Sequence, residues 1–170
     1  GHKMSYTSFF KRISPAQFLA FSTSSSAATL PVTLECVKDR IGVSKEVSSF
    51  VLPIGATVNM DGTSLYQAVA AIFLAQSHMI ELSFGSQMEI MLLALMASIG
   101  SAAVPSAGLV MLMIVLTSVG LNAEWVWLIF AVDRILDMCR TVVNVTGDAT
   151  VATIIASSEN ELNIVPEDKL

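Results

Sequence analysis

A stripe of polar side chains interrupts the apolar segment 136–155. Asp137, Arg140 or Thr141, Asn144 and Asp148 follow one another at steps of three or four residues. On an α-helix this spacing places them on one face. A charged residue at the centre of a membrane helix costs about 2.5 to 3.5 kcal/mol, and such residues usually face a bundle interior or a cavity. The segment therefore predicts a helix that carries a polar binding site.

The chemistry of this stripe suits a zwitterion with one additional carboxylate. Arg140 offers a planar fork of donors that matches a carboxylate. Asp137, one turn earlier, suits an ammonium group, Asn144 both donates and accepts, and Asp148 supplies oxygen ligands for a hard cation. This combination describes an acidic amino acid. The alternative is an internal Asp137–Arg140 salt bridge in a packed bundle, with Asp148 exposed at the helix end.

A second polar motif, NMDGT at 59–63, lies inside the mostly apolar segment 47–76. Asn, Asp, Gly and Thr together break a helix and expose carbonyl groups, which with a carboxylate suit Na⁺ as a hard cation. The alternative is a turn between two soluble helices. The serine-rich stretch 23–31 could present backbone N–H groups to an anion, and the small-residue stretch 98–108 could do so from the opposite side.

The composition is typical of a membrane protein or of part of one. Of 170 residues, 54% are hydrophobic and 14% charged, against about 25% charged in an ordinary soluble domain. The net charge of −5 argues against a nucleic-acid partner. We find no nucleophile elbow, P-loop or G-x-G-x-x-G motif, so we expect neither an enzyme nor an organic cofactor. The spacing of Cys36 and Cys139 indicates neither a disulfide framework nor a metal site.

Two segments predict re-entrant hairpins, which enter a membrane and return. The apolar arms 88–97 and 109–121 reach roughly 15 to 20 Å each as helices, whereas a bilayer core of about 30 Å needs about 20 residues. Small residues and Pro105 break the helix between them, and 15–37 has the same layout. Irregular backbone at membrane depth needs protein or a water-filled cavity around it. The alternative is a soluble helix pair with a Gly/Pro turn.

We therefore predict an all-α membrane protein made of consecutive helical segments. Residues 1–4 are expected to be a tag remnant and the start of the chain. The segments that follow are a first re-entrant hairpin (5–37), a polar connector (38–46), a broken helix with the NMDGT motif (47–76), a loop (77–87), a second re-entrant hairpin (88–121), a last helix (122–157) and a loosely ordered polar tail (158–170).

In this order the motifs resemble those of the sodium–glutamate/aspartate symporter family. The matching stretches are SSSAATLP, LPIGATVNMDGTSLYQ, ASIGSAAVPSAG and DRILDMCRTVVNVTGD, which together run from about residue 15 to 156. The resemblance implies two re-entrant hairpins, a broken helix and a polar-striped last helix, which form the transport core of a Na⁺-coupled carrier of acidic amino acids.

The resemblance also implies roles for individual residues in recognising the substrate. Arg140 corresponds to the arginine that pairs with the side-chain carboxylate of the substrate, and Thr63 lies nearby. Asp137 and Thr141 correspond to the positions that hold the amine.

Other matching positions are implied to hold the rest of the substrate. Asn144 and the Ser25–Ser26 region correspond to those that bind the α-carboxylate. Val104 and Gly108 correspond to the second hairpin, which acts as the gate.

Three sodium sites are implied in the same way. One uses Asp148 with the carbonyls of Gly55, Asn59 and Asn144. Another uses Asn59 and Asp61, with its remaining ligands on a helix that this chain lacks. The last uses carbonyl groups around four residues: Thr57, Ser98, Ile99 and Ser101.

Within the family, two positions favour an acidic amino acid as the substrate. Dicarboxylate carriers lack an aspartate at the position of Asp137, and neutral amino-acid carriers replace the arginine at Arg140. Asp148 and Asp61 favour Na⁺ over proton coupling.

The sequence also departs from the family pattern. Many relatives carry an additional arginine where this chain has Ser24 or Met138, which puts the kinetics of transport in doubt. Ala103 replaces a glycine at the tip of the gate, which would stiffen it.

The expected protein is therefore the substrate- and sodium-binding core of a multi-pass transporter of the cell membrane, the inner membrane if bacterial. Family members have six more transmembrane helices before the first hairpin, including a scaffold that forms a homotrimer, and we expect this chain to be a fragment without them. The expected partners are an acidic amino acid, sodium ions, membrane lipid and the missing scaffold helices. The alternatives are a proton-coupled C4-dicarboxylate carrier and a non-transporting helical fragment without a physiological ligand.

Overall fold

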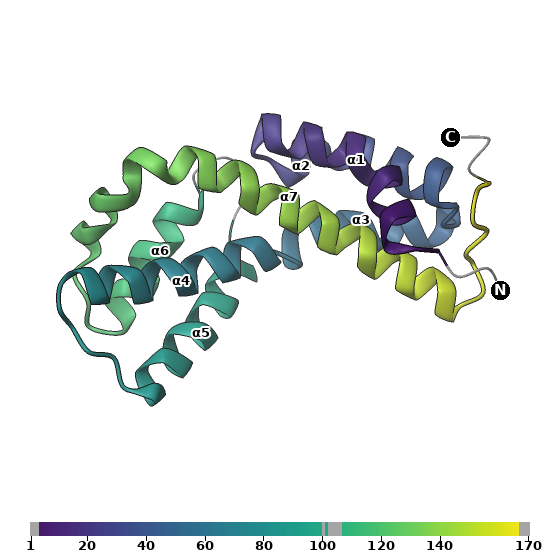
Figure 1. The fold of residues 1–170 in the computed structure, drawn as a ribbon. Coiled ribbons are helices and arrows are strands. Elements are labelled where there is room, and N and C mark those ends of the chain that lie inside the picture. Colours follow the sequence, from purple (N-terminus) through teal and green to yellow (C-terminus); the bar gives the residue numbers. More distant parts are fainter. Residues whose placement is uncertain (1–3, 100, 102–106, 167–170) are drawn as a thin grey trace.

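The computed structural model describes residues 4–99, 101 and 107–166, and within these ranges every regular element is helical. The prediction of an all-α protein is therefore confirmed. The elements are α1 (Tyr6–Thr23), α2 (Ser26–Glu35), the π-helix η1 (Cys36–Ile41), α3 (Lys45–Val58), α4 (Asp61–Ser77), α5 (Phe84–Ile99), α6 (Ala107–Ser118), the 3₁₀-helix η2 (Ala123–Val126) and α7 (Trp127–Ser158) (Figure 1).

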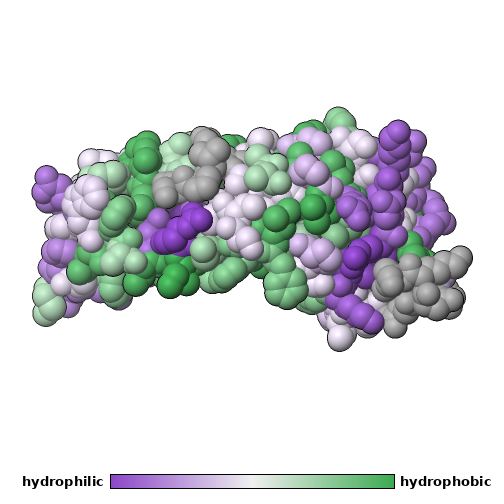
Figure 2. All heavy atoms as spheres, turned by 90° about the horizontal axis from the view of Figure 1, so that it is seen from above, coloured by the Kyte–Doolittle hydropathy of each residue, from purple (hydrophilic) through white to green (hydrophobic). Residues whose placement is uncertain are grey.

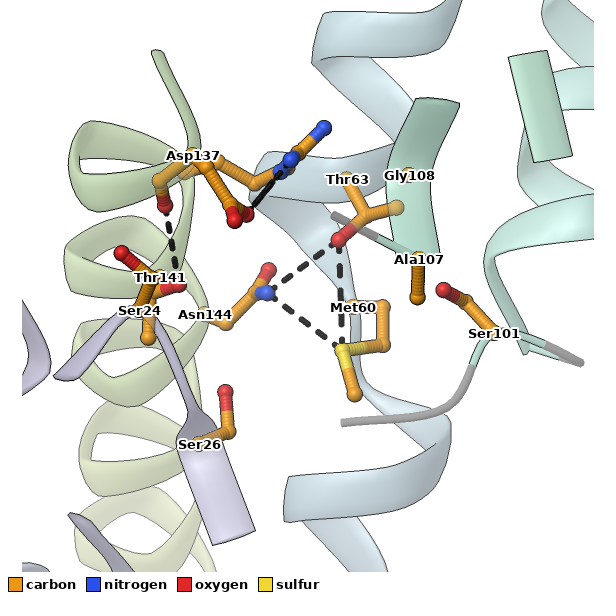
Figure 3. Close-up of a pocket in the computed structure, with 11 residues that line it drawn as sticks. Ser24, Ser26, Met60, Thr63, Ser101, Ala107, Gly108, Asp137, Thr141 and Asn144 are labelled. Carbon is orange, nitrogen blue, oxygen red and sulfur yellow. Dashed lines mark hydrogen bonds and ion pairs between the residues drawn. The ribbon is translucent and has the colours of Figure 1, made fainter. Parts of the chain in front are cut away.

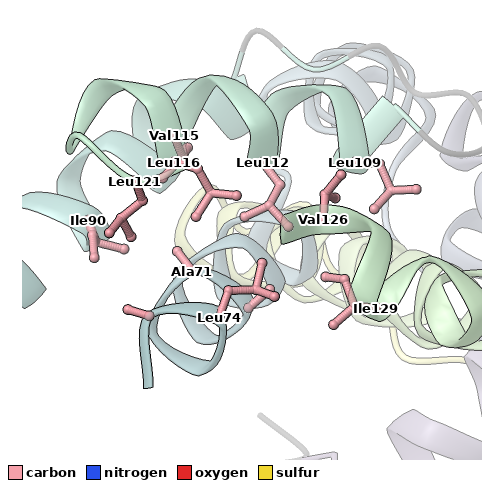
Figure 4. Packing of buried hydrophobic residues seen from close by; sticks show 12 residues of the cluster. Ala71, Leu74, Ile90, Leu109, Leu112, Val115, Leu116, Leu121, Val126 and Ile129 are labelled. Carbon is pink, nitrogen blue, oxygen red and sulfur yellow. The ribbon is translucent and has the colours of Figure 1, made fainter. Parts of the chain in front are cut away.

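The 32-residue helix α7 runs along most of the molecule, and the other helices gather around its two halves (Figure 1). Helices α1 and α3 pack on its C-terminal half, with α2 between them, whereas α4 packs on its N-terminal half and α5 and α6 pack on α4. We call these groups the first and the second lobe. Each lobe has its own apolar core, and that of the second lobe brings α4, α5 and α6 against η2 and α7 (Figure 4).

The first lobe begins with two helices joined by a tip of two residues. Ser24 takes the left-handed conformation, with φ at 51°, and its N–H donates to the carbonyl of Ala20 at 2.9 Å. Ser25 then caps α2, because its Oγ accepts from the N–H of Ala28 at 3.2 Å. The serine stretch thus ends one helix and starts the next, which is the layout predicted for the first hairpin. Entry of this hairpin into a membrane stays a prediction.

Several helix limits differ from those expected, and local capping explains the clearest of them. The connector expected at 38–46 is mostly helical, since η1 runs to Ile41 and α3 starts at Lys45. The loop expected at 77–87 is shorter because α5 starts at Phe84. Ser83 lies just before that helix, and its Oγ accepts from the N–H of Ser86 at 3.1 Å, as an N-cap does.

The broken helix is interrupted where the sequence indicates. Helix α3 ends at Val58 and α4 begins at Asp61, while Asn59 and Met60 have non-helical backbone angles. The predicted second hairpin corresponds to α5 and α6, and most of its tip lies outside the described residues.

Much of the surface is apolar. Large apolar side chains that are at least half exposed occur on α1, α3, α4, α5 and α7, for example Phe18, Phe50, Leu65, Met96 and Ile154. Figure 2 shows such side chains over a large part of one face. In the part of the chain that is described, no helix is both long enough and apolar enough to cross a membrane. Extensive exposed apolar surface is typical of a region that contacts lipid or another protein.

Candidate binding site

Helix α7 buries the polar stripe that the sequence predicts. Asp137, Arg140, Thr141, Asn144 and Asp148 are all at most 5% exposed. Helical spacing explains this arrangement, because steps of three and four residues keep the side chains on the face that α1, α3 and α4 cover. Asp148 is therefore not an exposed residue at the helix end, and this part of the alternative interpretation is wrong.

Arg140 lies at the centre of a buried cluster of charges. Its Nη2 is 2.5 Å from Oδ1 of Asp137 and 3.9 Å from Oδ1 of Asp133. Its Cζ lies 4.3 Å from the centre of the Tyr66 ring, and the Tyr66 hydroxyl donates to Asp133 at 2.8 Å. Nη1 is buried and has no hydrogen-bond partner among the described residues. The internal salt bridge of the alternative interpretation thus exists, but it leaves one donor of the guanidinium unused.

The unused donor points at the N-terminal turn of α6. A methyl group added at Gly108 would overlap Nη1 and Cζ of Arg140, so the backbone of α6 comes very close to the guanidinium. A small pocket lies at this junction of the two lobes (Figure 3). It is lined by residues of the first hairpin tip, of the start of α4, of the second hairpin and of α7: Ser24, Ser26, Met60, Thr63, Ser101, Ala107, Gly108, Asp137, Arg140, Thr141 and Asn144.

The free space in this pocket is about 20 Å³, which is room for roughly one water molecule. The guanidinium of Arg140 lines this pocket beside Gly108 and takes up part of its space. A ligand as large as an amino acid requires the side chains or the second hairpin to move.

The pocket brings together seven of the nine predicted substrate residues: Ser26, Thr63, Gly108, Asp137, Arg140, Thr141 and Asn144. Ser25 is buried but serves as the cap of α2, and Ser24 lines the pocket instead. Val104 lies outside the described residues. Sequence reasoning did not name Met60 and Ala107 as pocket residues. Met60 directly precedes the start of α4, a position that the predicted break in this helix could have indicated.

Asn144 joins α7 to the beginning of α4. Its Oδ1 accepts from the N–H of Gly62 at 2.7 Å, and its Nδ2 lies 3.3 Å from both Oγ1 of Thr63 and the sulfur of Met60. Helices α4 and α7 lie very close together here, because a methyl group at Gly62 would overlap the carbonyl of Arg140. The break between α3 and α4 is thereby held directly against the pocket.

Asp148 and Asn59 form a second polar centre one turn further along α7. The Asn59 amide donates to Oδ1 of Asp148 at 3.0 Å, and a methyl group on Gly55 would lie 2.5 Å from the same oxygen. No basic side chain in the described ranges is within ion-pair distance of Asp148. A buried carboxylate without a cationic partner is costly. Its surroundings suit a small cation held by oxygen atoms.

The remaining predicted ion ligands fall into two groups. Asp61 lies near Asn59, since a methyl group at Gly147 would be 2.6 Å from Oδ2 of Asp61 and 3.1 Å from Nδ2 of Asn59. The other group comes from the end of α3, the end of α5 and the segment just after α5: Thr57, Ser98, Ile99 and Ser101.

None of the four residues in this group, Thr57, Ser98, Ile99 and Ser101, has a carboxylate side chain that could bind an ion. Thr57 donates through its hydroxyl to the carbonyl of Ile54 at 2.9 Å, and Ser98 to that of Leu95 at 2.8 Å. Ile99 is 49% exposed. Within the described ranges, no three His, Cys, Asp or Glu residues come together in a way that could hold a metal ion. Any ion here would depend on backbone carbonyls.

Comparison with known proteins identifies the family. The model of the sodium:dicarboxylate symporter family matches residues 2–158. The chain belongs to this family. An excitatory amino acid transporter of Caenorhabditis elegans is 53% identical over 147 residues, which are 86% of this chain and 29% of that protein. Excitatory amino acid transporter 2 of Mus musculus is 51% identical over 93% of this chain and 28% of its own length.

A third relative has a similar identity and a similar coverage. Excitatory amino acid transporter 1 of Homo sapiens is 54% identical over 82% of this chain and 26% of its own length. The chain thus spans less than a third of the length of these three relatives. The printed name of the family refers to symport of sodium with dicarboxylates by its members.

For this symporter chain we expect Gly108→Ala to weaken aspartate binding by about tenfold or more, because the added methyl group displaces the Arg140 guanidinium from its partners. Displacement of the guanidinium also weakens its buried ion pair with Asp137, so the thermal unfolding midpoint should fall, although alanine is favoured over glycine in a helix by about 1 kcal/mol. Isothermal titration calorimetry and thermal unfolding measure the two effects.

The matched control is Gly85→Ala, also near the start of a helix, where the nearest atom to an added methyl group is 3.7 Å away. Equal aspartate affinity in both variants would contradict the close packing of Gly108 on Arg140.

Proposed function

We propose that this chain is the substrate- and sodium-binding core of a secondary active transporter that takes up glutamate or aspartate together with Na⁺. The observation that carries the proposal is the pairing of two features in one pocket: an arginine with an unused donor, and a carboxylate beside it on the same helix face. The names of the most similar relatives, excitatory amino acid transporters, support the same substrate class.

The substrate would contact three sets of groups in the pocket. Its side-chain carboxylate would accept from the guanidinium of Arg140, and its ammonium group would donate to Asp137 and Thr141. The α-carboxylate would lie between the Asn144 amide and the tip of the first hairpin, where Ser26 lines the pocket and Ser24 has a buried hydroxyl without a partner in the described residues. Buried polar groups of this kind favour ligands that satisfy them.

Sodium coupling follows from the connection between the two polar centres. An ion at Asp148 would take oxygen ligands from Asn59 and Gly55 and so fix the break between α3 and α4. Met60 lies in that break and Thr63 in the first turn of α4 after it, and both contact Asn144 in the substrate pocket. An ion that orders this segment raises the affinity for the substrate, and by linkage the substrate raises the affinity for the ion.

The transporter that contains this core is proposed to lie in the cell membrane, with lipid and additional helices around the exposed apolar surface. The relatives are more than three times as long as the segment they share with this chain, which leaves room for a scaffold and for assembly into a homotrimer. We propose that the second hairpin closes the pocket and that the two lobes then move together against that scaffold.

Calorimetry of the 170-residue chain in detergent tests this function. We expect heat on addition of L-aspartate in NaCl, none in choline chloride, and none with succinate in either salt. Binding of succinate without Na⁺ would instead support a proton-coupled dicarboxylate carrier. The absence of heat with any of these ligands in both salts would support an inert helical fragment and contradict the proposal.

A further inference from the structure

The segment after α7 turns back along the base of the first hairpin. Three backbone hydrogen bonds within the described residues join it to residues 41–44, where the chain leaves η1 and which we call the exit of η1. The Ser44 N–H donates to the Glu161 carbonyl at 3.0 Å, the Asn163 N–H to the Gly42 carbonyl at 2.8 Å, and the Val165 N–H to the Ile41 carbonyl at 3.4 Å. Val43 and Leu162 form an antiparallel bridge. We call residues 159–166 the C-terminal strap. The sequence predicts a loosely ordered tail at 158–170, and the described part of it makes these backbone hydrogen bonds.

Gly42 is the position at which the strap comes closest to the hairpin. It has a φ of +100°, which favours glycine. A methyl group there would overlap the carbonyl of Asn163. A side chain at residue 42 would therefore push the strap away.

The strap is also held by apolar contacts. Leu162 packs against the core of the first lobe, together with Met4 from the start of the chain. This core contains residues of α1, η1, α3 and the C-terminal part of α7: Ile13, Val37, Ile41, Val43, Leu52, Ala149, Ala152 and Ala156. The strap thus covers the first lobe at the C-terminal end of α7, on the side away from α4, α5 and α6 (Figure 1).

The other side of the same exit is held by a buried arginine. Arg12 of α1 is 2% exposed, donates through Nε to Ser8 at 3.0 Å and donates through Nη1 to the carbonyl of Arg40. A cation at the C-terminal end of a helix is electrostatically favourable. The exit of η1 is therefore clamped between α1 and the strap.

We propose that the C-terminal strap fixes the base of the first hairpin to the end of α7 and so keeps its serine tip in place in the pocket. The tip is joined to α2 by hydrogen bonds among Thr23, Ser25 and Thr29, so the tip and α2 form one connected unit. Helix α2 contacts η1, α3 and α7. Loss of the strap frees the exit of η1, and α2 with its tip loosens as one unit. This proposal does not depend on which ligand the pocket binds.

Hydrogen exchange of the ligand-free 170-residue chain, followed by mass spectrometry, tests the strap. In Gly42→Ala we expect the amides of α2 and of residues 41–44 to exchange about tenfold faster, as loss of one or two hydrogen bonds predicts. The amides of α4–α6 should not change.

The matched control is Gly120→Ala, since Gly120 also has a positive φ, +76°, but an added methyl group there meets no atom within 4 Å. Unchanged exchange of α2 in Gly42→Ala would overturn the proposal, as would equal acceleration of α2 in the Gly120→Ala control.

A second pair of variants removes the strap itself. A chain that ends at Ser158 should show the same faster exchange in α2, whereas a chain that ends at Pro166 should exchange like the parent. Retention of the parent exchange rates after loss of the strap would overturn the proposal. Faster exchange throughout α4–α6 would also overturn it, because the effect would then be global unfolding.

Discussion

Replacement of Arg140 by alanine is expected to weaken aspartate binding roughly 10²- to 10³-fold, as loss of one partner of a buried ion pair does. The variant removes the forked donor for the substrate and leaves Asp137 and Asp133 buried without a cation. Calorimetry in NaCl measures the effect. The matched control is Arg134→Ala, an exposed arginine of the same helix, which should bind like the parent.

Arg140→Lys separates recognition from folding. Lysine keeps a positive charge near the two carboxylates, so the thermal unfolding midpoint should fall less than in Arg140→Ala. It lacks the planar fork that matches a carboxylate, so aspartate binding should remain at least about tenfold weaker than in the parent. Parent-like affinity in Arg140→Lys would show that charge alone is sufficient and would contradict forked recognition.

Asp148→Asn is expected to remove the effect of Na⁺ on substrate binding. The buried carboxylate of Asp148 has the Asn59 amide and no basic group as partner in the described residues, so a bound cation is the group that would neutralise it. Asparagine has nearly the same shape and no charge. Aspartate affinity in NaCl should fall to the level of the parent chain in choline chloride.

The unfolding midpoint gives an independent readout for the same variant. A bound ion stabilises the parent with increasing Na⁺ concentration, and this increase should disappear in Asp148→Asn. Without Na⁺ the variant should be at least as stable as the parent, because a costly buried charge is gone. Asp39→Asn, at an exposed ion pair with Lys38, is the control. A parent-like response to Na⁺ in Asp148→Asn would contradict the proposed ion site.

The sequence predicts those parts of the structure that depend on local periodicity. The stripe on α7 repeats every three or four residues, and it is buried as expected. The break at NMDGT and the two-residue tip between α1 and α2 follow from helix-breaking and capping residues. Burial of one face and interruption of a helix require no knowledge of distant neighbours, which is why they could be recognised.

Features that depend on tertiary contacts were not predicted. Tyr66 and Asp133 are 67 residues apart in the chain, and their hydrogen bond beside Arg140 results from the packing of α4 on α7. Ser24 rather than Ser25 lines the pocket because the left-handed turn at Ser24 directs the next serine to cap α2. Neighbouring serines look alike in a sequence, and backbone geometry decides which one reaches the pocket.

The ion pair between Arg140 and Asp137 has a consequence for selectivity. Asp137 binds Nε and Nη2 of the guanidinium and leaves Nη1 unused, so an incoming carboxylate that takes both arms of the fork must compete with an internal one. A simple anion such as chloride can displace Asp137 only by leaving that carboxylate buried without a cation, which is unfavourable. A molecule with both an ammonium group and a carboxylate can replace the ion pair, because its carboxylate pairs with Arg140 while its ammonium group pairs with Asp137. If the pocket binds substrate as proposed, we expect the Arg140–Asp137 pair to screen the arginine from inorganic anions and to favour amino acids.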